Sequence, residues 1–318
     1  MSTERSSVRT LVKRPASWTE RLDEEQFAYL LVLPAFLLVG AMAFWPLVRT
    51  FELSLHADSL FGGGYVDEFV GIENYTALLT GERDSILGNP FFSLSKPFSS
   101  AIVVTLIFTV VSVAFETLIG FGQALVLDQD FRGRRWVRVA IIIPWAVPIA
   151  IQGMIFYLLF QPGIGFGTSL MQDLGVFTST PLINSVDSMI ILIVADIWKA
   201  SAFMALLILA GLQSVDRTLY KVGRVSGASR WQMFKMITFP LVLPTLLVAM
   251  LFRTIQAMRV FGTVETITSC SNIPTLTCLV VDTFSSGRYG TSAAVAFITA
   301  VIVGSVAMVY IVWFADVS

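Results

Sequence analysis

The chain has 318 residues, of which 55% are hydrophobic and 14% charged, and its mean hydropathy is +0.77. Soluble domains carry about 25% charged residues, so a chain this apolar is predicted to be a polytopic membrane protein. The net charge of -1 provides no basic field that would attract nucleic acid.

Signatures of catalysis and nucleotide binding are missing from the sequence. It contains no GxxxxGK[ST] phosphate loop, no HExxH pair and no GxSxG elbow, and its one histidine, His56, has no cysteine or histidine at ligand spacing. The chain is therefore expected not to be an enzyme, and to bind no cofactor or metal ion itself.

Six segments are apolar over the roughly 20 residues that a helix needs to cross the hydrocarbon core. They cover residues 27–48, 101–127, 137–160, 188–212, 241–261 and 293–314. This pattern predicts an all-α bundle of six transmembrane helices that forms one membrane domain over residues 27–318. Prolines inside the segments predict kinks rather than broken spans: Pro34, Pro144, Pro148 and Pro244.

The first span has a competing interpretation as a cleaved signal peptide, because AMA at residues 41–43 resembles a cleavage site. The charged leader is long, and the apolar run continues through Phe44, Trp45 and Leu47. An uncleaved span is favoured.

Lysine and arginine accumulate in cytoplasmic segments of membrane proteins and so indicate orientation. Fourteen lie in residues 1–26 or follow the second and fourth spans: Arg5, Arg9, Lys13, Arg14, Arg21, Arg132, Arg134, Arg135, Arg138, Arg217, Lys221, Arg224, Arg230 and Lys235. Four lie in the alternate segments: Arg49, Arg83, Lys96 and Arg288. Both termini are predicted to be cytoplasmic, residues 1–26 to form a cytoplasmic segment, and external segments to cover about 49–100, 161–187 and 262–292.

Charged and polar residues inside the spans are functional candidates, because charge at mid-membrane is costly. Asp196 and Lys199 in the fourth span lie at i,i+3, and Arg253, Gln256 and Arg259 in the fifth repeat that spacing. Two interpretations stay open. The residues line a pathway, or Asp196 with Lys199, and Glu116 of the second span with Arg253, form structural ion pairs.

The cytoplasmic segment of residues 213–240 has an amphipathic pattern, which a simple connection does not need. Asp216 could cap a short helix that carries Leu219, Val222 and Val225 on one face, and Gly227 interrupts it.

A second short helix from Ala228 would present Trp231, Phe234 and Ile237 together, with Pro240 and Pro244 near the start of the fifth span. The resulting helix–glycine–helix hairpin could lie in the lipid interface or fit into a groove on a partner protein.

The stretch GASRWQMFKMITFPLVLP resembles the cytoplasmic loop of permeases from binding-protein-dependent ABC importers, whose pattern is EAA-x3-G-x9-I-x-L-P. The pattern's glycine falls on Gly227, its isoleucine on Ile237 and its proline on Pro240, with Phe239 in place of leucine. The small residues Ala228 and Ser229 that follow the glycine allow another backbone to approach closely.

The EAA triplet falls on Lys221, Val222 and Gly223, so a lysine replaces the usual glutamate. In the family that acidic residue is associated with a basic site on the ATPase. The departure leaves the electrostatic part of the resemblance in doubt, but not the role of the loop.

The resemblance extends over nearly the whole chain and is strongest to the carbohydrate-uptake branch, the maltose and trehalose permease type. It implies a multi-pass subunit of the inner (plasma) membrane that carries a disaccharide or oligosaccharide. It also implies a second homologous permease, two ATPase subunits that bind ATP and Mg, and an extracytoplasmic solute-binding protein. The alternative function, a gradient-driven secondary transporter, would need an internal repeat and paired broken helices.

In such an importer the hairpin docks the ATPase and transmits its motion, with Trp231 and Phe234 as anchors. The sugar path is lined by the spans on either side of this loop. Donors, acceptors and a flat apolar wall for a sugar would then come from Asp196, Lys199, Phe203, Arg253, Gln256 and Arg259.

Two cysteines, Cys270 and Cys278, lie in TSCSNIPTLTC within the last external segment, where oxidation is permitted. A disulfide that stiffens this loop is predicted, and two free thiols are the alternative.

Overall fold

The computed structural model describes residues 23–58 and 68–317, and its regular structure is helical, apart from an isolated β-bridge between His56 and Phe69. The basic residues expected in the N-terminal segment, from Arg5 to Arg21, lie outside the described residues. Within these ranges the prediction of an all-α fold is confirmed.

Within these described ranges, five helical rods are long and apolar enough to cross a membrane, and a bent pair of helices makes a sixth if it counts as one span. The spanning elements are α2 (Glu24–Val39) continued by η1 (Gly40–Phe44) and α3 (Trp45–Ser54), α6 (Ala101–Asp128), α7 (Arg134–Ala146) with α8 (Ile149–Phe160), α10 (Ser185–Ser214), α12 (Arg230–Met233) continued by η3 (Phe234–Thr238) and α13 (Phe239–Met258), and α16 (Tyr289–Val317). The connections hold α4 (Glu73–Thr80), α5 (Asp84–Leu87), η2 (Pro97–Ser99), α9 (Phe166–Asp173), α11 (Arg217–Val225), α14 (Gly262–Ile267) and α15 (Leu276–Ser285).

The chain divides into two compact units, one that ends at Leu53 and one that begins at Ser54. In the first unit, the helix α2 buries none of its residues against the part of the chain that is described. A helix that is apolar all round requires lipid or a partner helix around it.

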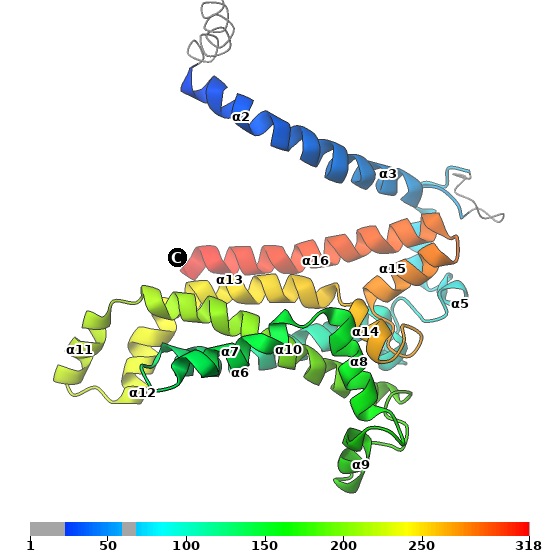
Figure 1. Cartoon of the computed structure of the whole chain (residues 1–318). Helices are drawn as coiled ribbons and strands as arrows, with labels where there is room; N and C mark the ends of the chain where they lie inside the picture. The colour runs from blue at the N-terminus through cyan, green and yellow to red at the C-terminus, as the bar shows by residue number, and fades with distance from the viewer. Residues whose placement is uncertain (1–22, 59–67, 318) are drawn as a thin grey trace, which may run out of the picture. The chain divides into compact units, whose positions relative to one another are not determined.

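In the second unit, α6 and α10 pack along their lengths and α13 lies against both (Figure 1). Gly120 permits this approach, because a Cβ atom at its position would lie 2.6 Å from Cβ of Met204 and 3.0 Å from the carbonyl oxygen of Ser201. Small residues at a helix crossing let the backbones come close inside a membrane, where lipid tails remove the hydrophobic drive for association.

The third span is broken, so the prediction of a kinked but continuous helix is wrong here. Helices α7 and α8 meet at 93° across Val147 and Pro148, which both have extended backbone angles. A proline cannot donate a backbone hydrogen bond, and it disfavours helical angles in the residue before it. The carbonyl of Val147 that the break leaves free accepts a hydrogen bond from Nζ of Lys199 on α10.

The fifth span begins earlier than predicted, because its helix runs without a break from Arg230 to Met258. Pro240 lies inside this rod, where its ring would clash with a regular helical turn. A π-helical turn, η3, precedes it, and the N–H of Phe239 bonds the carbonyl of Phe234. The same arrangement occurs in the first span, where η1 ends two residues before Pro46. Inserted π turns therefore let both helices contain proline.

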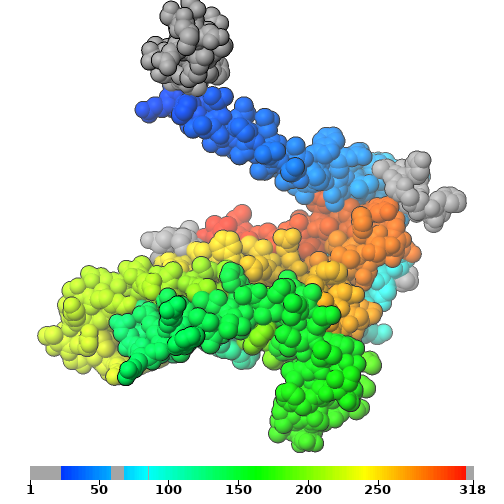
Figure 2. Space-filling model, in the orientation of Figure 1, coloured from blue at the N-terminus to red at the C-terminus, as the bar shows by residue number. Residues whose placement is uncertain are grey.

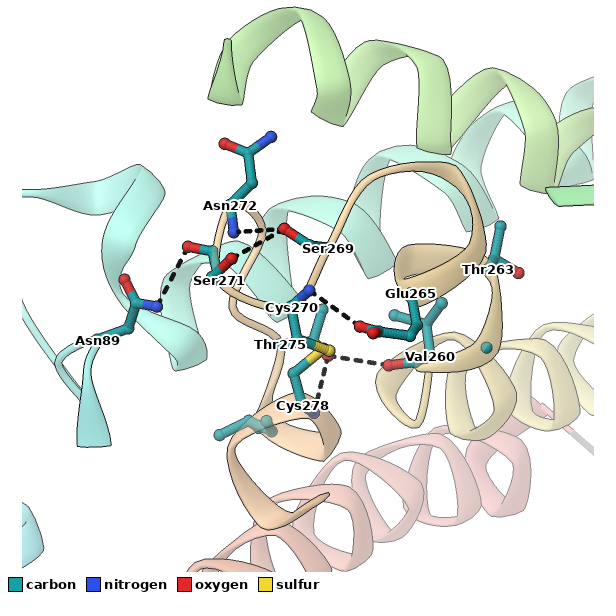
Figure 3. Close-up of a disulfide and its surroundings, with 12 residues drawn as sticks. Asn89, Val260, Thr263, Glu265, Ser269, Cys270, Ser271, Asn272, Thr275 and Cys278 are labelled. Carbon is teal, nitrogen blue, oxygen red and sulfur yellow. Dashed lines mark hydrogen bonds between the residues drawn. A yellow bond between two sulfur atoms is a disulfide. The ribbon is translucent and has the colours of Figure 1, made fainter. Parts of the chain in front are cut away.

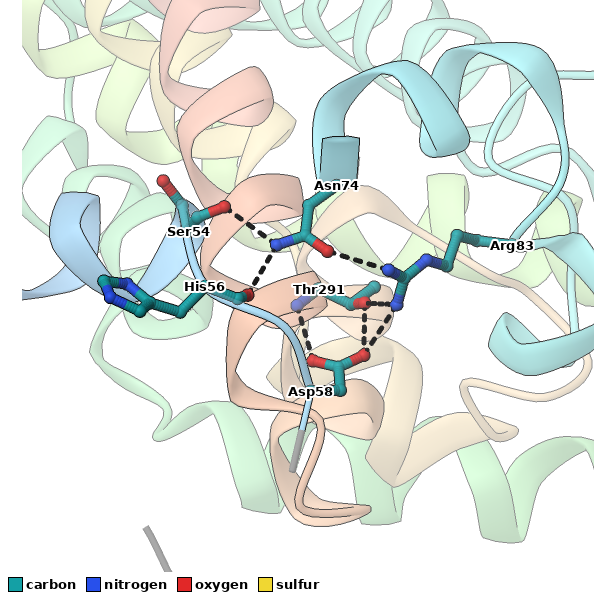
Figure 4. A network of polar contacts seen from close by, with 6 residues as sticks. All are labelled: Ser54, His56, Asp58, Asn74, Arg83 and Thr291. Atoms are coloured by element: carbon teal, nitrogen blue, oxygen red, sulfur yellow. Dashed lines mark hydrogen bonds and ion pairs between the residues drawn. The ribbon is translucent and has the colours of Figure 1, made fainter. Parts of the chain in front are cut away.

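The connection between the first span and α6 is attached to α16 through a polar network centred on Arg83 (Figure 4). Its guanidinium donates to Asp58 at 2.8 Å, Thr291 at 2.7 Å and Asn74 at 2.8 Å. Asp58 in turn accepts the backbone N–H of Thr291 in the first turn of α16, at 2.9 Å. A carboxylate at this position satisfies free N–H groups and complements the helix dipole.

Replacement of Arg83 by methionine is expected to reduce the free energy of unfolding by about 3 kcal/mol, because it leaves the half-buried Asp58 carboxylate unpaired. Thermal unfolding in detergent measures the effect. Arg49 also pairs with a carboxylate, that of Glu52, but both side chains are about half exposed, and Arg49→Met is expected to cost less than about 1 kcal/mol. Equal losses in the two variants would contradict a stabilising role for the network.

Candidate functional site

One buried cluster of opposite charges lies inside the bundle. Arg253 on α13 donates to both carboxylate oxygens of Glu116 on α6, from Nε at 2.5 Å and from Nη2 at 2.8 Å. The same Nη2 lies 2.7 Å from Oδ2 of Asp196 on α10. Glu116 and Arg253 are both buried, so a single guanidinium joins three spans.

The planar fork of arginine makes this arrangement possible, since it can meet one carboxylate with two parallel bonds and still reach another. The interpretation of Glu116 and Arg253 as an ion pair is confirmed. The interpretation of Asp196 and Lys199 as an ion pair is wrong, because Asp196 pairs with Arg253 and Lys199 donates to the backbone of the broken span. Sequence spacing places two side chains on one helix face but does not say which neighbouring helix they meet.

A cavity of about 370 Å³ adjoins this cluster, and residues of α8, α10, α13 and α14 line it. All six residues predicted for the substrate pathway are in its wall: Asp196, Lys199, Phe203, Arg253, Gln256 and Arg259. The cavity therefore combines charged and amide groups with apolar groups in its lining.

Two further residues of the cavity were missed by the sequence reasoning. Trp145, at the end of α7, stacks on Phe203 with ring centroids 6.4 Å apart and planes at 27°. Gln152 on α8 donates from Nε2 to the carbonyl of Ala195 at 2.7 Å, while its Oε1 is buried without a partner among the described residues. The signal that could have found them is the Pro-x-x-x-Pro interval at residues 144–148, since a break there turns both flanking segments inward.

A second cavity, of about 530 Å³, lies at the other end of α8 and α14, and no charged residue lines it. Its wall includes Tyr157, Ser269, Ser271 and Asn272, and the last three belong to the loop that carries the disulfide (Figure 3).

The disulfide joins Cys270 to Cys278, whose Cα atoms are 5.4 Å apart. Asn272 fixes the same loop by donating from Nδ2 to the carbonyl of Leu182 at 3.1 Å and to Ser188 and Thr268 at 2.9 Å. The loop is thus held by one covalent bond and by contacts to α10.

In the hairpin of residues 213–240 the predicted cap at Asp216 is present, and a second cap, which was not predicted, starts the second helix at Arg230 rather than Ala228. Asp216 accepts the N–H of Thr218 at 2.8 Å, and the hydrogen bonds from Thr218 hold the pKa of Asp216 below its ordinary value. Ser229 and Gln232 form a capping box at the start of α12. Gly227 between the helices has φ +77°, a backbone angle that favours glycine.

The hairpin lies at one end of the second unit, in yellow-green in Figure 2, and it exposes several apolar side chains. Leu219 and Val222 are exposed, Val225 is 91% exposed and Trp231 is 70% exposed. Lys221 is exposed beside them. The two helices therefore present a solvent-facing apolar surface at the tip of a capped, rigid turn.

Trp231, Phe234 and Ile237, which were expected to form one apolar ridge on the second helix, do not lie on one surface. Trp231 stacks on Phe234, with ring centroids 5.4 Å apart, but Phe234 also meets Phe121 of α6 at 5.7 Å. Ile237 packs against the buried cluster of the bundle. The π turn that begins at Phe234 rotates the later residues inward, which the spacing of three could not reveal.

An ion pair connects the hairpin to the end of α6. Arg217 donates to both oxygens of Asp128, at 2.8 and 2.5 Å, and this contact raises the pKa of Arg217. Since α6 also carries Glu116, one helix joins the base of the hairpin to the charged cluster.

The chain is similar in sequence and in fold to known membrane transport proteins. Residues 116–317 match the family described as binding-protein-dependent transport system inner membrane component. The trehalose/maltose transport system permease protein MalF of Thermococcus litoralis is 33% identical and covers 91% of this chain and 93% of its own. The trehalose transport system permease protein SugA of Mycobacterium tuberculosis is 32% identical over 79% of this chain and 76% of its own.

A solved structure of a bacterial ABC transporter that imports the acidic polysaccharide alginate has the same fold. One of its chains superposes with a TM-score of 0.70 at 19% identity, over 98% of this chain and 99% of that one. A structure of the alginate transporter in complex with an alginate pentasaccharide-bound periplasmic protein gives a TM-score of 0.69 at 19% identity, over 89% of this chain and 92% of that one.

Replacement of Arg253 by methionine is expected to destabilise the protein by about 3–5 kcal/mol, because the buried Glu116 loses its only cation. Arg259→Met is the matched control. Arg259 lines the same cavity and forms no ion pair with a described residue, so its loss is expected to leave the unfolding temperature nearly unchanged. Thermal unfolding in detergent compares the two, and similar temperatures for both would exclude a structural role for the charged cluster.

Proposed function

Because the chain belongs to the family of binding-protein-dependent transport system inner membrane components, we propose that it is one permease subunit of an ATP-driven importer of sugars. The sugar class is a disaccharide or oligosaccharide of the maltose and trehalose type. As a member of this family the chain is a multi-pass inner-membrane transporter subunit and not an enzyme. The complete importer contains a second homologous permease, two ATPase subunits that hold ATP and Mg, and an extracytoplasmic solute-binding protein.

The observation that carries the proposal is the exposed apolar surface of the hairpin. Inside lipid such a surface needs no explanation, but α11 lies between the fourth and fifth spans and α12 is only the first turn of the fifth rod, and both helices are capped. Val225 and Trp231 are exposed there with Arg224 and Arg230 around them. An amphipathic helix of this kind fits an apolar groove on a partner, and aromatic anchors often contribute most of the interface energy. The partner is the ATPase, and both termini lie on its side of the membrane, as the distribution of lysine and arginine indicates.

Lys221 stands where the family pattern has an acidic residue, so it cannot form the usual ion pair with a basic site on the ATPase. It is exposed next to the apolar surface and forms no ion pair with a described residue. Docking in this importer rests on the apolar contact, and Lys221 is peripheral to it.

The cavity beside the charged cluster has the chemistry that a sugar requires. The stacked pair of Trp145 and Phe203 supplies a flat wall for the apolar face of a pyranose ring. The unpartnered Oε1 of Gln152 can accept from a sugar hydroxyl, and Lys199 and Gln256 add polar groups to the lining. A few fixed polar groups in a mostly apolar pocket are typical of small-molecule sites.

Motion of the docked hairpin reaches this cavity along α6. Arg217 binds Asp128 at the cytoplasmic end of that helix, and Glu116 binds Arg253 three turns further in. Helix bundles support rigid-body movements of this kind, because their packed elements shift as units.

The hairpin surface is tested by Val225→Ser together with Trp231→Ala. The double variant is expected to bind the ATPase about thirtyfold more weakly, since loss of a central tryptophan contact costs about 2 kcal/mol or more. The readouts are retention of the ATPase during purification and ATP-dependent uptake of radiolabelled trehalose and maltose into proteoliposomes.

Two controls accompany this variant. Met236→Ala removes an exposed apolar side chain from η3 outside the surface, and Lys221→Ala removes the substituted residue of the motif. Both are expected to retain the ATPase. Full retention by the double variant would overturn the docking role, and uptake without ATPase that a protonophore abolishes would establish the gradient-driven alternative.

The cavity is tested separately by Phe203→Ala. Loss of the aromatic wall is expected to raise the KM for uptake about tenfold with ATPase retention unchanged, since aromatic stacking contributes about 0.5–1.5 kcal/mol. Phe252→Ala is the matched control, because Phe252 is an exposed phenylalanine of α13 outside the cavity. An unchanged KM in Phe203→Ala would exclude this cavity from the sugar path.

A further inference from the structure

The start of α7 carries three arginines around one small hollow. Arg134, Arg135 and Arg138 are the residues that line it, and its volume is about 230 Å³. Arg134 and Arg138 are one turn apart on the helix, and Arg135 lies between them at i+3 from Arg138. The positive-inside tendency accounts for arginines in this connection, but not for their convergence on one concave site.

These cations are poorly compensated by the described part of the chain. Arg134 pairs with Asp130 at 2.9 Å, but the side chain of Asp130 is 99% exposed, so water weakens this contact. Arg135 and Arg138 form no ion pair with any described carboxylate. Asp128, the nearby carboxylate that is largely buried, is already bonded twice by Arg217.

Two donors in the hollow are unsatisfied as well. The Nε atoms of Arg134 and Arg138 are buried, and neither has a hydrogen-bond partner among the described residues. An unpaired buried donor on a charged group costs several kcal/mol. The first turn of a helix also disfavours cations, since its dipole is positive there, and Gly133 supplies no side-chain cap. An anion in the hollow would compensate the charge of the three guanidinium groups and complement the helix dipole.

The neighbouring surface indicates which anion this is. Trp136, next to the hollow, is 76% exposed, and tryptophan is enriched at the level of lipid headgroups. Val139 and Ile143 continue from Arg135 along the same face at intervals of four, and both are exposed. The helix thus presents cations, then an interfacial aromatic residue, then an apolar strip toward the membrane interior.

We infer that the hollow binds the phosphate group of an anionic phospholipid from the cytoplasmic leaflet, with an acyl chain along Val139 and Ile143. Arginine forks match phosphate oxygens with two bonds each, and basic pockets beside cytoplasmic helix ends suit anionic headgroups. Free inorganic phosphate shares the headgroup chemistry but would leave the apolar strip unused. This inference does not depend on the transported sugar or on the ATPase.

The test uses the full chain purified in neutral detergent and supplied with phosphatidylglycerol, phosphatidylcholine or inorganic phosphate, with bound molecules counted by native mass spectrometry. Wild type is expected to retain phosphatidylglycerol in preference to phosphatidylcholine. The triple variant Arg134→Gln, Arg135→Gln, Arg138→Gln is expected to bind phosphatidylglycerol about a hundredfold more weakly, because each arginine near an anionic surface contributes about fivefold.

A single substitution tests the same site in case the triple variant does not fold. Arg135→Gln changes an exposed side chain and is expected to weaken phosphatidylglycerol binding about fivefold while the unfolding temperature stays the same. The matched control is the triple variant Arg224→Gln, Arg230→Gln, Lys235→Gln, which removes three other cations expected on the same side of the membrane. This variant is expected to retain phosphatidylglycerol as wild type does.

Several results would overturn the inference. These are equal retention of the two lipids by wild type, unchanged retention in Arg135→Gln and the triple variant, or the same loss in the control. Displacement of phosphatidylglycerol by inorganic phosphate would also overturn it, because the site would then recognise a soluble anion.

Discussion

The guanidinium of Arg253 determines how three helices of the bundle meet. It is buried between the carboxylates of Glu116 and Asp196, which come from two other spans. Burial of an unpaired charge in a membrane bundle is costly, so the rotation of each helix is restricted to one that keeps the cluster complete. The substrate-sized cavity adjoins this cluster, and its shape depends on the same rotations.

The break in the third span also restricts how the helices pack. It is stabilised by contacts with α10, one of the helices that the charged cluster positions. Prolines open the backbone between α7 and α8, and irregular backbone at membrane depth must be satisfied by protein groups. Lys199 does this by donating to the carbonyl of Val147, and Gln152 of α8 ties the other arm of the break to α10 by donating to the carbonyl of Ala195. Each of these hydrogen bonds joins the third span to α10, so the helix that carries Asp196 also stabilises the break. Its consequence is that Trp145 reaches Phe203 and completes an aromatic wall.

The same architecture attaches the hairpin of residues 213–240 firmly to the bundle. Asp216 and Ser229 cap its two helices, and Arg217 fastens it to Asp128 at the end of α6. The second arm continues into α13 without a joint, since a π turn accommodates Pro240. The hairpin is therefore joined directly to α6 and α13, two of the three helices that contribute to the charged cluster.

The sequence by itself determined the six apolar segments, the hairpin between the fourth and fifth with its cap at Asp216, and the set of intramembrane polar residues that line one cavity, because hydropathy, capping and helical spacing are local properties. Only the tertiary structure decided that Asp196 pairs with Arg253 instead of Lys199, that the third span breaks at Pro148, and that Ile237 turns into the bundle. The reason is physical. Local spacing sets which side chains share a helix face, but the helix that this face meets depends on how proline breaks, π turns and buried charges are satisfied together.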